Sequence, residues 1–158
     1  NNKFILEKFA SKPWSERLAK PSNKNIVRVD RELDSPLPPE AQELDAVINV
    51  LFYHDTFWMG TDRLTMNHNI FTALKHGGVY CIVDHSGRPG TGAKEVSSLH
   101  RIEEKLVRDE IESEGFKLVA EGNFLRNSND TRDWNASPMA AGERRGTSDR
   151  FVLKFVKP

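Results

Sequence analysis

The chain has 158 residues, enough for one domain that buries its own core. Lys and Arg together number 23, as do Asp and Glu, so no net field favours nucleic acid or an anionic membrane as a partner. No apolar run approaches the roughly 18 residues of a membrane span, and the single cysteine, Cys81, excludes an intrachain disulfide scaffold.

The N-terminal part predicts one helix and one short strand. Apolar residues on one face indicate a helix over 4–19, which Pro13 kinks or restarts. The β-branched run 26–30 indicates a strand, and three prolines between 35 and 39 indicate a loop. The sequence begins at Asn1 without a Met or a signal peptide, so we expect a fragment whose preceding residues are missing.

The central part predicts two buried strands around a helix. Residues 44–52 are almost continuously apolar, which is typical of a strand covered on both faces. Apolar periodicity predicts a helix over 62–76 that ends at Gly77, and 79–83 forms a second buried strand. A polar loop rich in glycine follows from 86 to 98.

The C-terminal part predicts a helix, two strands and a long connection. The helix begins at Leu99 and ends at Gly115, and strands cover 116–120 and 151–156. The polar stretch 127–149 is long enough to be a mobile loop or a lid. The alternation predicts one α/β domain over the whole chain, with parallel strands, right-handed crossovers and an antiparallel pair at the sheet edge.

Four motifs, in this order, resemble the C-terminal part of class I S-adenosylmethionine-dependent methyltransferases. The resemblance covers about residues 24 to 158. It implies a Rossmann-like three-layer sandwich whose mostly parallel sheet ends in an antiparallel strand and here lacks its first strands. The motifs are Leu44-Asp45-Ala46-Val47, Ala73-Leu74-Lys75-His76-Gly77-Gly78 before the strand that ends at Asp84, Glu114-Gly115-Phe116, and Phe151-Val152-Leu153-Lys154.

Three further motifs resemble a bacterial subgroup of predicted methyltransferases with poorly defined substrates. They are Phe52-Tyr53-His54-Asp55, Val83-Asp84-His85-Ser86 and Leu99-His100-Arg101-Ile102. The family resemblance implies S-adenosylmethionine as the cofactor, with Asp30, Asn49 and Leu51 near it; a solvated loop carboxylate is the alternative for Asp30. The glycine-rich turn and the acidic strand end that hold most of this cofactor are absent from the sequence. The resemblance therefore implies a methyltransferase when intact and an inactive fragment alone.

Polar triplets follow both buried strands of the predicted sheet. Because ligands bind outside the carboxyl ends of parallel strands, we expect Tyr53–Asp55 and Asp84–Ser86 to share a cleft with His100. Histidine suits proton transfer near neutral pH, so our hypothesis is that His54 or His85 is the base. Tyr53 and Asp55 would orient the reactants. The predicted substrate-binding residues are Asp84, His100, Arg101 and Trp58.

Several alternatives stay open at this point. The histidines could be structural hydrogen-bonding residues, or they could hold a divalent metal with Asp55 and Asp84; no compact ligand spacing supports a metal, so we expect none. A non-catalytic binding or assembly module derived from a methyltransferase is the second functional hypothesis. A hydrolase is disfavoured because the sequence has no Gly-x-Ser-x-Gly elbow.

The predicted partners are a small-molecule substrate and something that covers an open sheet edge. Without the family's first strand, the strand over 46–51 would expose apolar residues and unpaired backbone groups. We expect the missing N-terminal segment or a second chain to cover it, a homodimer being one such arrangement. Nucleic acid and membrane are not expected. The compartment is left open; a soluble, cytoplasmic protein is favoured.

Overall fold

The computed structural model describes residues 11–158, and the chain divides into two compact units, one up to Asp30 and one over Arg31–Pro158. The first unit contains helix α2 (Ser11–Leu18) and the short 3-10 helix η2 (Pro21–Asn23). The predicted helix over 4–19 is helical over Ser11–Leu18, and its part before Ser11 lies outside the described residues. The strand predicted over 26–30 is wrong: this stretch has no strand partner and its apolar side chains are exposed.

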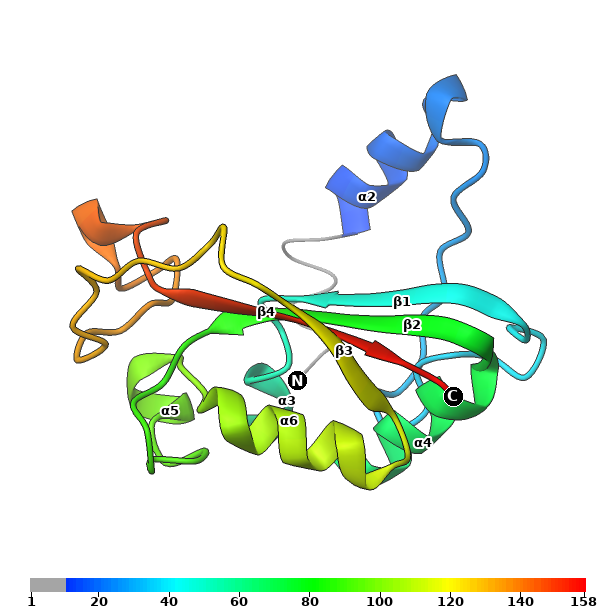
Figure 1. The fold of residues 1–158 in the computed structure, drawn as a ribbon. Coiled ribbons are helices and arrows are strands. Elements are labelled where there is room, and N and C mark those ends of the chain that lie inside the picture. Colours follow the sequence, from blue (N-terminus) through cyan, green and yellow to red (C-terminus); the bar gives the residue numbers. More distant parts are fainter. Residues whose placement is uncertain (1–10) are drawn as a thin grey trace. The chain divides into compact units, whose positions relative to one another are not determined.

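A sheet of four strands forms the second unit, in the order β1-β2-β4-β3 (Figure 1). β1 and β2 are parallel, and β4 runs antiparallel to both of its neighbours. This confirms the predicted mostly parallel sheet with a reversed C-terminal strand. The strands are β1 (Leu44–Val50), β2 (Leu74–His85), β3 (Lys117–Gly122) and β4 (Arg150–Val156).

Helices of the second unit pack under one face of this sheet (Figure 1). Helix α4 begins at its N-cap Asp62, whose carboxylate accepts the backbone N–H of Thr65 at 3.1 Å. Helix α6 buries Val107 and Ile111 and turns its charged residues outward. The helices are α3 (Asp55–Trp58), α4 (Arg63–Ala73), α5 (Val96–Leu99) and α6 (Glu104–Ser113), and the short 3-10 helix η3 (Gly142–Arg144) lies in the long connection before β4.

Strand pairing overrides helix propensity at two places. Helix α4 ends at Ala73 rather than at Gly77, because β2 begins at Leu74, which pairs with Leu44 of β1, and the Gly77 N–H donates to the Lys157 carbonyl. The helix predicted from Leu99 is also wrong at its start. Ile102 forms a parallel bridge with Ser86, so α6 begins only at Glu104. In both places the backbone gains partners from a distant part of the chain.

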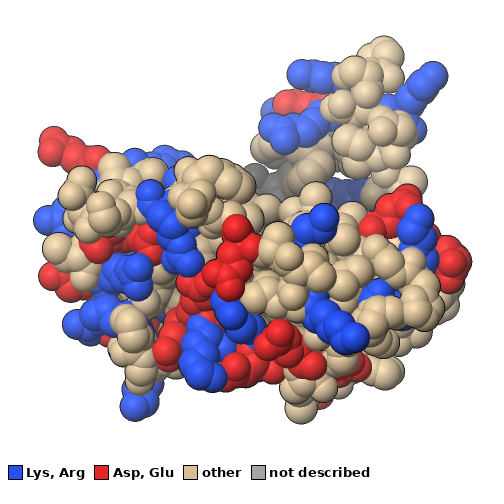
Figure 2. Space-filling view, in the orientation of Figure 1, with Lys and Arg blue, Asp and Glu red and all other residues tan. Residues whose placement is uncertain are grey.

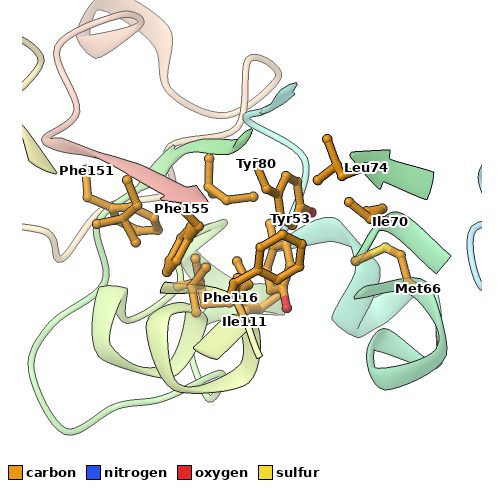
Figure 3. Packing of buried hydrophobic residues seen from close by; sticks show 14 residues of the cluster. Tyr53, Met66, Ile70, Leu74, Tyr80, Ile111, Phe116, Phe151 and Phe155 are labelled. Carbon is orange, nitrogen blue, oxygen red and sulfur yellow. The ribbon is translucent and has the colours of Figure 1, made fainter. Parts of the chain in front are cut away.

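The core lies between the sheet and these helices, and Figure 3 shows its aromatic and aliphatic side chains in contact range of one another. Tyr80, Phe151 and Phe155 are fully buried on this face. On the opposite face, Ile48 is 69% exposed and Val50 is 53% exposed. Within Arg31–Pro158, β1 is therefore covered on one face only, and its predicted cover on the second face would have to come from outside this unit.

Two observations on residues 11–158 concern membrane spanning and the distribution of surface charge. None of the helices in residues 11–158 combines the length and apolarity that crossing a bilayer requires. Basic and acidic side chains alternate over the face in Figure 2, with no broad area of one sign.

Candidate active site

The polar triplets after β1 and β2 meet at one edge of the sheet. Because the two strands are parallel and paired along their length, their carboxyl ends lie side by side. The His54 ring lies 5.7 Å from the His85 ring and 4.2 Å from the His100 ring, measured between centroids. The structure therefore brings together the three histidines that the sequence placed at a shared cleft. We call His54, Asp55, Asp84, His85 and His100 the histidine cluster.

Asp84 is the buried anchor of the histidine cluster. One of its oxygens accepts the backbone N–H of His54 at 2.9 Å; the other accepts the backbone N–H of His85 at 2.7 Å and lies 2.6 Å from His54 Nδ1. These contacts fix the His54 ring, so its second nitrogen, Nε2, faces the opposite direction. Asp84 thus positions a histidine, whereas the sequence predicted that it binds substrate directly.

His54 Nε2 is buried and makes no hydrogen bond. It lies 3.2 Å from Asp55 Oδ1, without the alignment that a hydrogen bond needs. Asp55 Oδ1 also lies 3.5 Å from His100 Nε2 and accepts the indole N–H of Trp58 at 2.8 Å. The side chains of Asp55 and His100 are 17% and 23% exposed, so the cluster reaches solvent on their side.

The three histidines differ in their electrostatic environments. Burial alone would lower the pKa of His54, but the carboxylates of Asp55 and Asp84 beside the ring raise the pKa to about 9. Burial lowers the pKa of His85 to about 4, because the Asp84 charge only partly compensates for it. Burial and the neighbouring His54 charge lower the pKa of His100. At neutral pH His54 is therefore a cation, while the rings of His85 and His100 are neutral.

Ser148 is a cluster neighbour that the sequence did not single out. Its hydroxyl lies 2.7 Å from His85 Nδ1, and its side chain belongs to the long connection before β4. The adjacent Asp149 ties this connection to the site, since its carbonyl accepts the Ser86 N–H at 2.9 Å. No local motif marks Ser148, because it lies 63 positions beyond His85 and reaches it only through the fold.

Two predicted site residues serve the core or the long connection instead. Tyr53 is fully buried among core side chains (Figure 3), and its hydroxyl donates to Glu110 and accepts from Asn67. Arg101 is also fully buried, and its guanidinium donates to Asp130 and to the Ser86 carbonyl. The structure thus places both side chains apart from the histidine cluster. Trp58, in contrast, is 49% exposed and lies at the cluster through Asp55.

The three predicted cofactor-binding residues have different surroundings within their own units. Asp30 is exposed, contacts Arg28, and belongs to the first unit. Asn49 borders a largely apolar cavity of about 320 Å³ at the free side of β1, where its side-chain oxygen is buried without a partner. Leu51 contributes a backbone N–H, but this donates to the Val83 carbonyl at 2.7 Å. At this cavity the Asn49 side-chain oxygen and the Tyr80 hydroxyl are buried without a hydrogen-bond partner, and the residues that line it form no complete cradle for a nucleoside.

Comparison with known proteins bears on the fold. No model of a known protein family matches the sequence, and no curated protein does. Solved structures do match. A proposed sarcosine dimethylglycine methyltransferase from Galdieria sulphuraria is 17% identical with a TM-score of 0.62, over 99% of this chain and 73% of its own. An S-adenosylmethionine-dependent methyltransferase from Mesorhizobium loti is 14% identical with a TM-score of 0.57, over 92% of this chain and 76% of its own.

These similarities agree with the strand order and with the reversed β4. The protein has the class I methyltransferase fold. The [4+2]-cyclase SpnF is also similar, with 15% identity and a TM-score of 0.57 over 94% of this chain, and this chain spans only 61% of that protein. Because one member of this group is named as a cyclase, the class I methyltransferase fold does not by itself assign the reaction.

Proposed function

We propose that the intact protein is an S-adenosylmethionine-dependent methyltransferase with a small-molecule acceptor, and that this chain supplies the acceptor side of its active site. The observation that carries the proposal is the position of the histidine cluster. It lies at the carboxyl ends of two parallel strands, β1 and β2, where α/β enzymes bind their ligands. The side chains of Asp55 and His100 are only 17% and 23% exposed, and this limited access favours a small acceptor over a polymer.

The cofactor site needs residues beyond those described. Asn49 and Tyr80 offer the unpaired polar groups at the cavity beside β1, and these two groups do not fit the whole cofactor. We propose that a preceding segment or a second chain pairs with the free edge of β1 and completes the site. This chain alone would then be inactive. Calorimetric titration with S-adenosylhomocysteine should give no binding heat for the 158-residue chain and clear heat for a longer gene product.

Within the histidine cluster, His85 is the better candidate for taking a proton from the acceptor. Its ring is neutral because its pKa is about 4, whereas His54, with a pKa of about 9, already holds a proton. A weak base suffices if the acceptor atom loses its proton after it has gained the methyl group, because that atom is then positively charged. The Ser148 hydroxyl at Nδ1 fixes the His85 ring. The rest of the rate enhancement would come from proximity and orientation.

The test replaces His85 with Gln in a longer gene product that binds S-adenosylhomocysteine. General-base catalysis is worth about 10²–10⁴-fold, so kcat should fall by about this factor while KM changes little. His76→Gln is the matched control, because His76 is exposed and lies at the opposite end of β2. Unchanged kcat in His85→Gln would refute the role of His85. A longer product that binds no S-adenosylhomocysteine would refute the methyltransferase proposal itself.

A further inference from the structure

We propose that His54 Nε2, Asp55 Oδ1 and His100 Nε2 form a binding site for a divalent transition-metal ion, with Zn²⁺ as the best fit. One ligand atom from each of His54, Asp55 and His100 lies within 4.8 Å of the ligand atoms of the other two residues. Two imidazoles and one carboxylate are a ligand set that proteins use for Zn²⁺ and for Fe²⁺. The proposal goes beyond methyl transfer, because metal binding at these atoms requires neither the cofactor nor an acceptor.

The distances between the ligand atoms fit a small ion. Ligand atoms that lie about 2.0–2.1 Å from a tetrahedral Zn²⁺ are about 3.3 Å from one another. Asp55 Oδ1 lies 3.2 Å from His54 Nε2 and 3.5 Å from His100 Nε2. The carboxylate oxygen therefore already stands at the ligand spacing from both imidazoles.

The independent observation is the unpaired nitrogen of His54. Buried polar atoms are nearly always hydrogen-bonded, and leaving one unpaired costs about 1–3 kcal/mol. His54 Nε2 is fully buried, has no hydrogen bond, and faces Asp55 and His100. A metal ion at this place would give the nitrogen a partner. The competing partner for this nitrogen is the Asp55 carboxylate, 3.2 Å away, so the experiment below has to separate metal binding from an ion pair.

Outer contacts hold two of the ligands in place. Asp84 contacts His54 Nδ1 at 2.6 Å, which is the carboxylate–histidine arrangement that fixes the free nitrogen of a metal-binding imidazole. The Trp58 indole N–H donates to Asp55 at 2.8 Å and restrains that carboxylate. Asp84 itself is fixed by the backbone N–H groups of His54 and His85. The histidine cluster thus contains both the ligands and their supports.

The site would also leave room for a substrate or a water molecule. Catalytic zinc sites have three protein ligands and keep a fourth position open. Here three ligands are available, and the partial exposure of Asp55 and His100 provides a path from solvent. The sequence did not favour a metal because His100 is distant along the chain from the adjacent pair His54 and Asp55.

The alternative is that these groups only satisfy one another through a histidine–carboxylate ion pair. Two titrations of the chelator-treated 158-residue chain distinguish metal binding from the ion pair. Calorimetry measures the binding of Zn²⁺, and visible absorption bands report the binding of Co²⁺. We expect one ion per chain. The affinity should fall at least tenfold in His100→Ala and in Asp55→Ala, and by about 10–100-fold in Asp84→Asn, which keeps the ligands but weakens their support.

Two controls keep the test specific. His76→Ala removes an exposed histidine away from the histidine cluster and should leave the affinity unchanged. Circular dichroism of each variant establishes that the fold is retained, and His100→Asn replaces His100→Ala if that variant unfolds. Absence of a one-to-one site, or equal affinity in the wild type and the His100 and Asp55 variants, would overturn the proposal. Because no methyl donor is present, this result is independent of the test of methyltransferase function.

Discussion

Two buried polar clusters lie on either side of Ser86, and they differ in how completely their groups are paired. The Arg101 guanidinium donates to Asp130, to the Ser86 carbonyl and to the Trp134 carbonyl, and Asp130 in turn accepts several N–H groups. In the histidine cluster, His54 Nε2 has no hydrogen bond. A fully paired buried network fixes a structure, whereas an unpaired buried atom requires an explanation, such as a water molecule or an ion. By this criterion the cluster around Arg101 and Asp130 holds the long connection before β4 in place, and the histidine cluster is the candidate site.

The largest effect should come from breaking the paired cluster. Arg101→Met leaves Asp130 buried without its cation, and removing one partner of a buried ion pair costs about 3–5 kcal/mol. Urea unfolding should show this loss in the free energy of unfolding. Lys105→Ala is the control: its pair with Asp109 is on the surface, and it should cost less than about 0.5 kcal/mol. Equal effects of the two variants would mean that Arg101 does not hold the long connection in place.

A smaller effect tests whether Tyr53 belongs to the core or to the site. Tyr53→Phe removes the hydroxyl that bonds Glu110 and Asn67, and a lost buried hydrogen bond costs about 1–3 kcal/mol. We expect this decrease in the free energy of unfolding, with Zn²⁺ affinity at the histidine cluster unchanged. Calorimetry and urea unfolding on the same preparation measure both. A tenfold change in Zn²⁺ affinity would place Tyr53 in the functional site.

Acid should weaken the paired cluster only once the pH falls below the ordinary pKa of its carboxyl groups. Burial opposes ionisation of Asp130 and Asp149, but hydrogen bonds and nearby arginines still hold the pKa of each carboxyl below its ordinary value of 3.8. Their contribution to stability is therefore complete above that value and is lost as the pH falls through the folded-state pKa. Urea unfolding between pH 6 and pH 3 should show a plateau and then a decline. In Asp149→Asn the decline should be shallower.

The sequence predicts those structural features that depend on residues close together in the chain. The periodicity of residues 44–52 and 79–83, with the four family motifs, predicts β1, β2 and the reversed β4 correctly. It also predicts the meeting of His54, His85 and His100, since this follows from parallel strands alone. The family resemblance assigns the fold, which the matching solved structures support.

The misses come from contacts between distant parts of the chain. The start of the helix at Leu99 fails because Ile102 pairs with Ser86. The predicted strand over 26–30 fails because a strand needs a partner that its own residues cannot indicate. In the same way, the sequence could not separate Tyr53 from His54, which are neighbours in the chain but point to the core and to the cluster respectively.

The free edge of β1 has a consequence for handling the molecule. Its row of amide and carbonyl groups has no neighbour on that side within Arg31–Pro158, and the adjoining Ile48 and Val50 side chains are largely in water. Such a surface is a template on which another extended chain can add. Raising the protein concentration should therefore drive self-association, and a lysine at position 48 should suppress it without disturbing the core on the other side of the sheet.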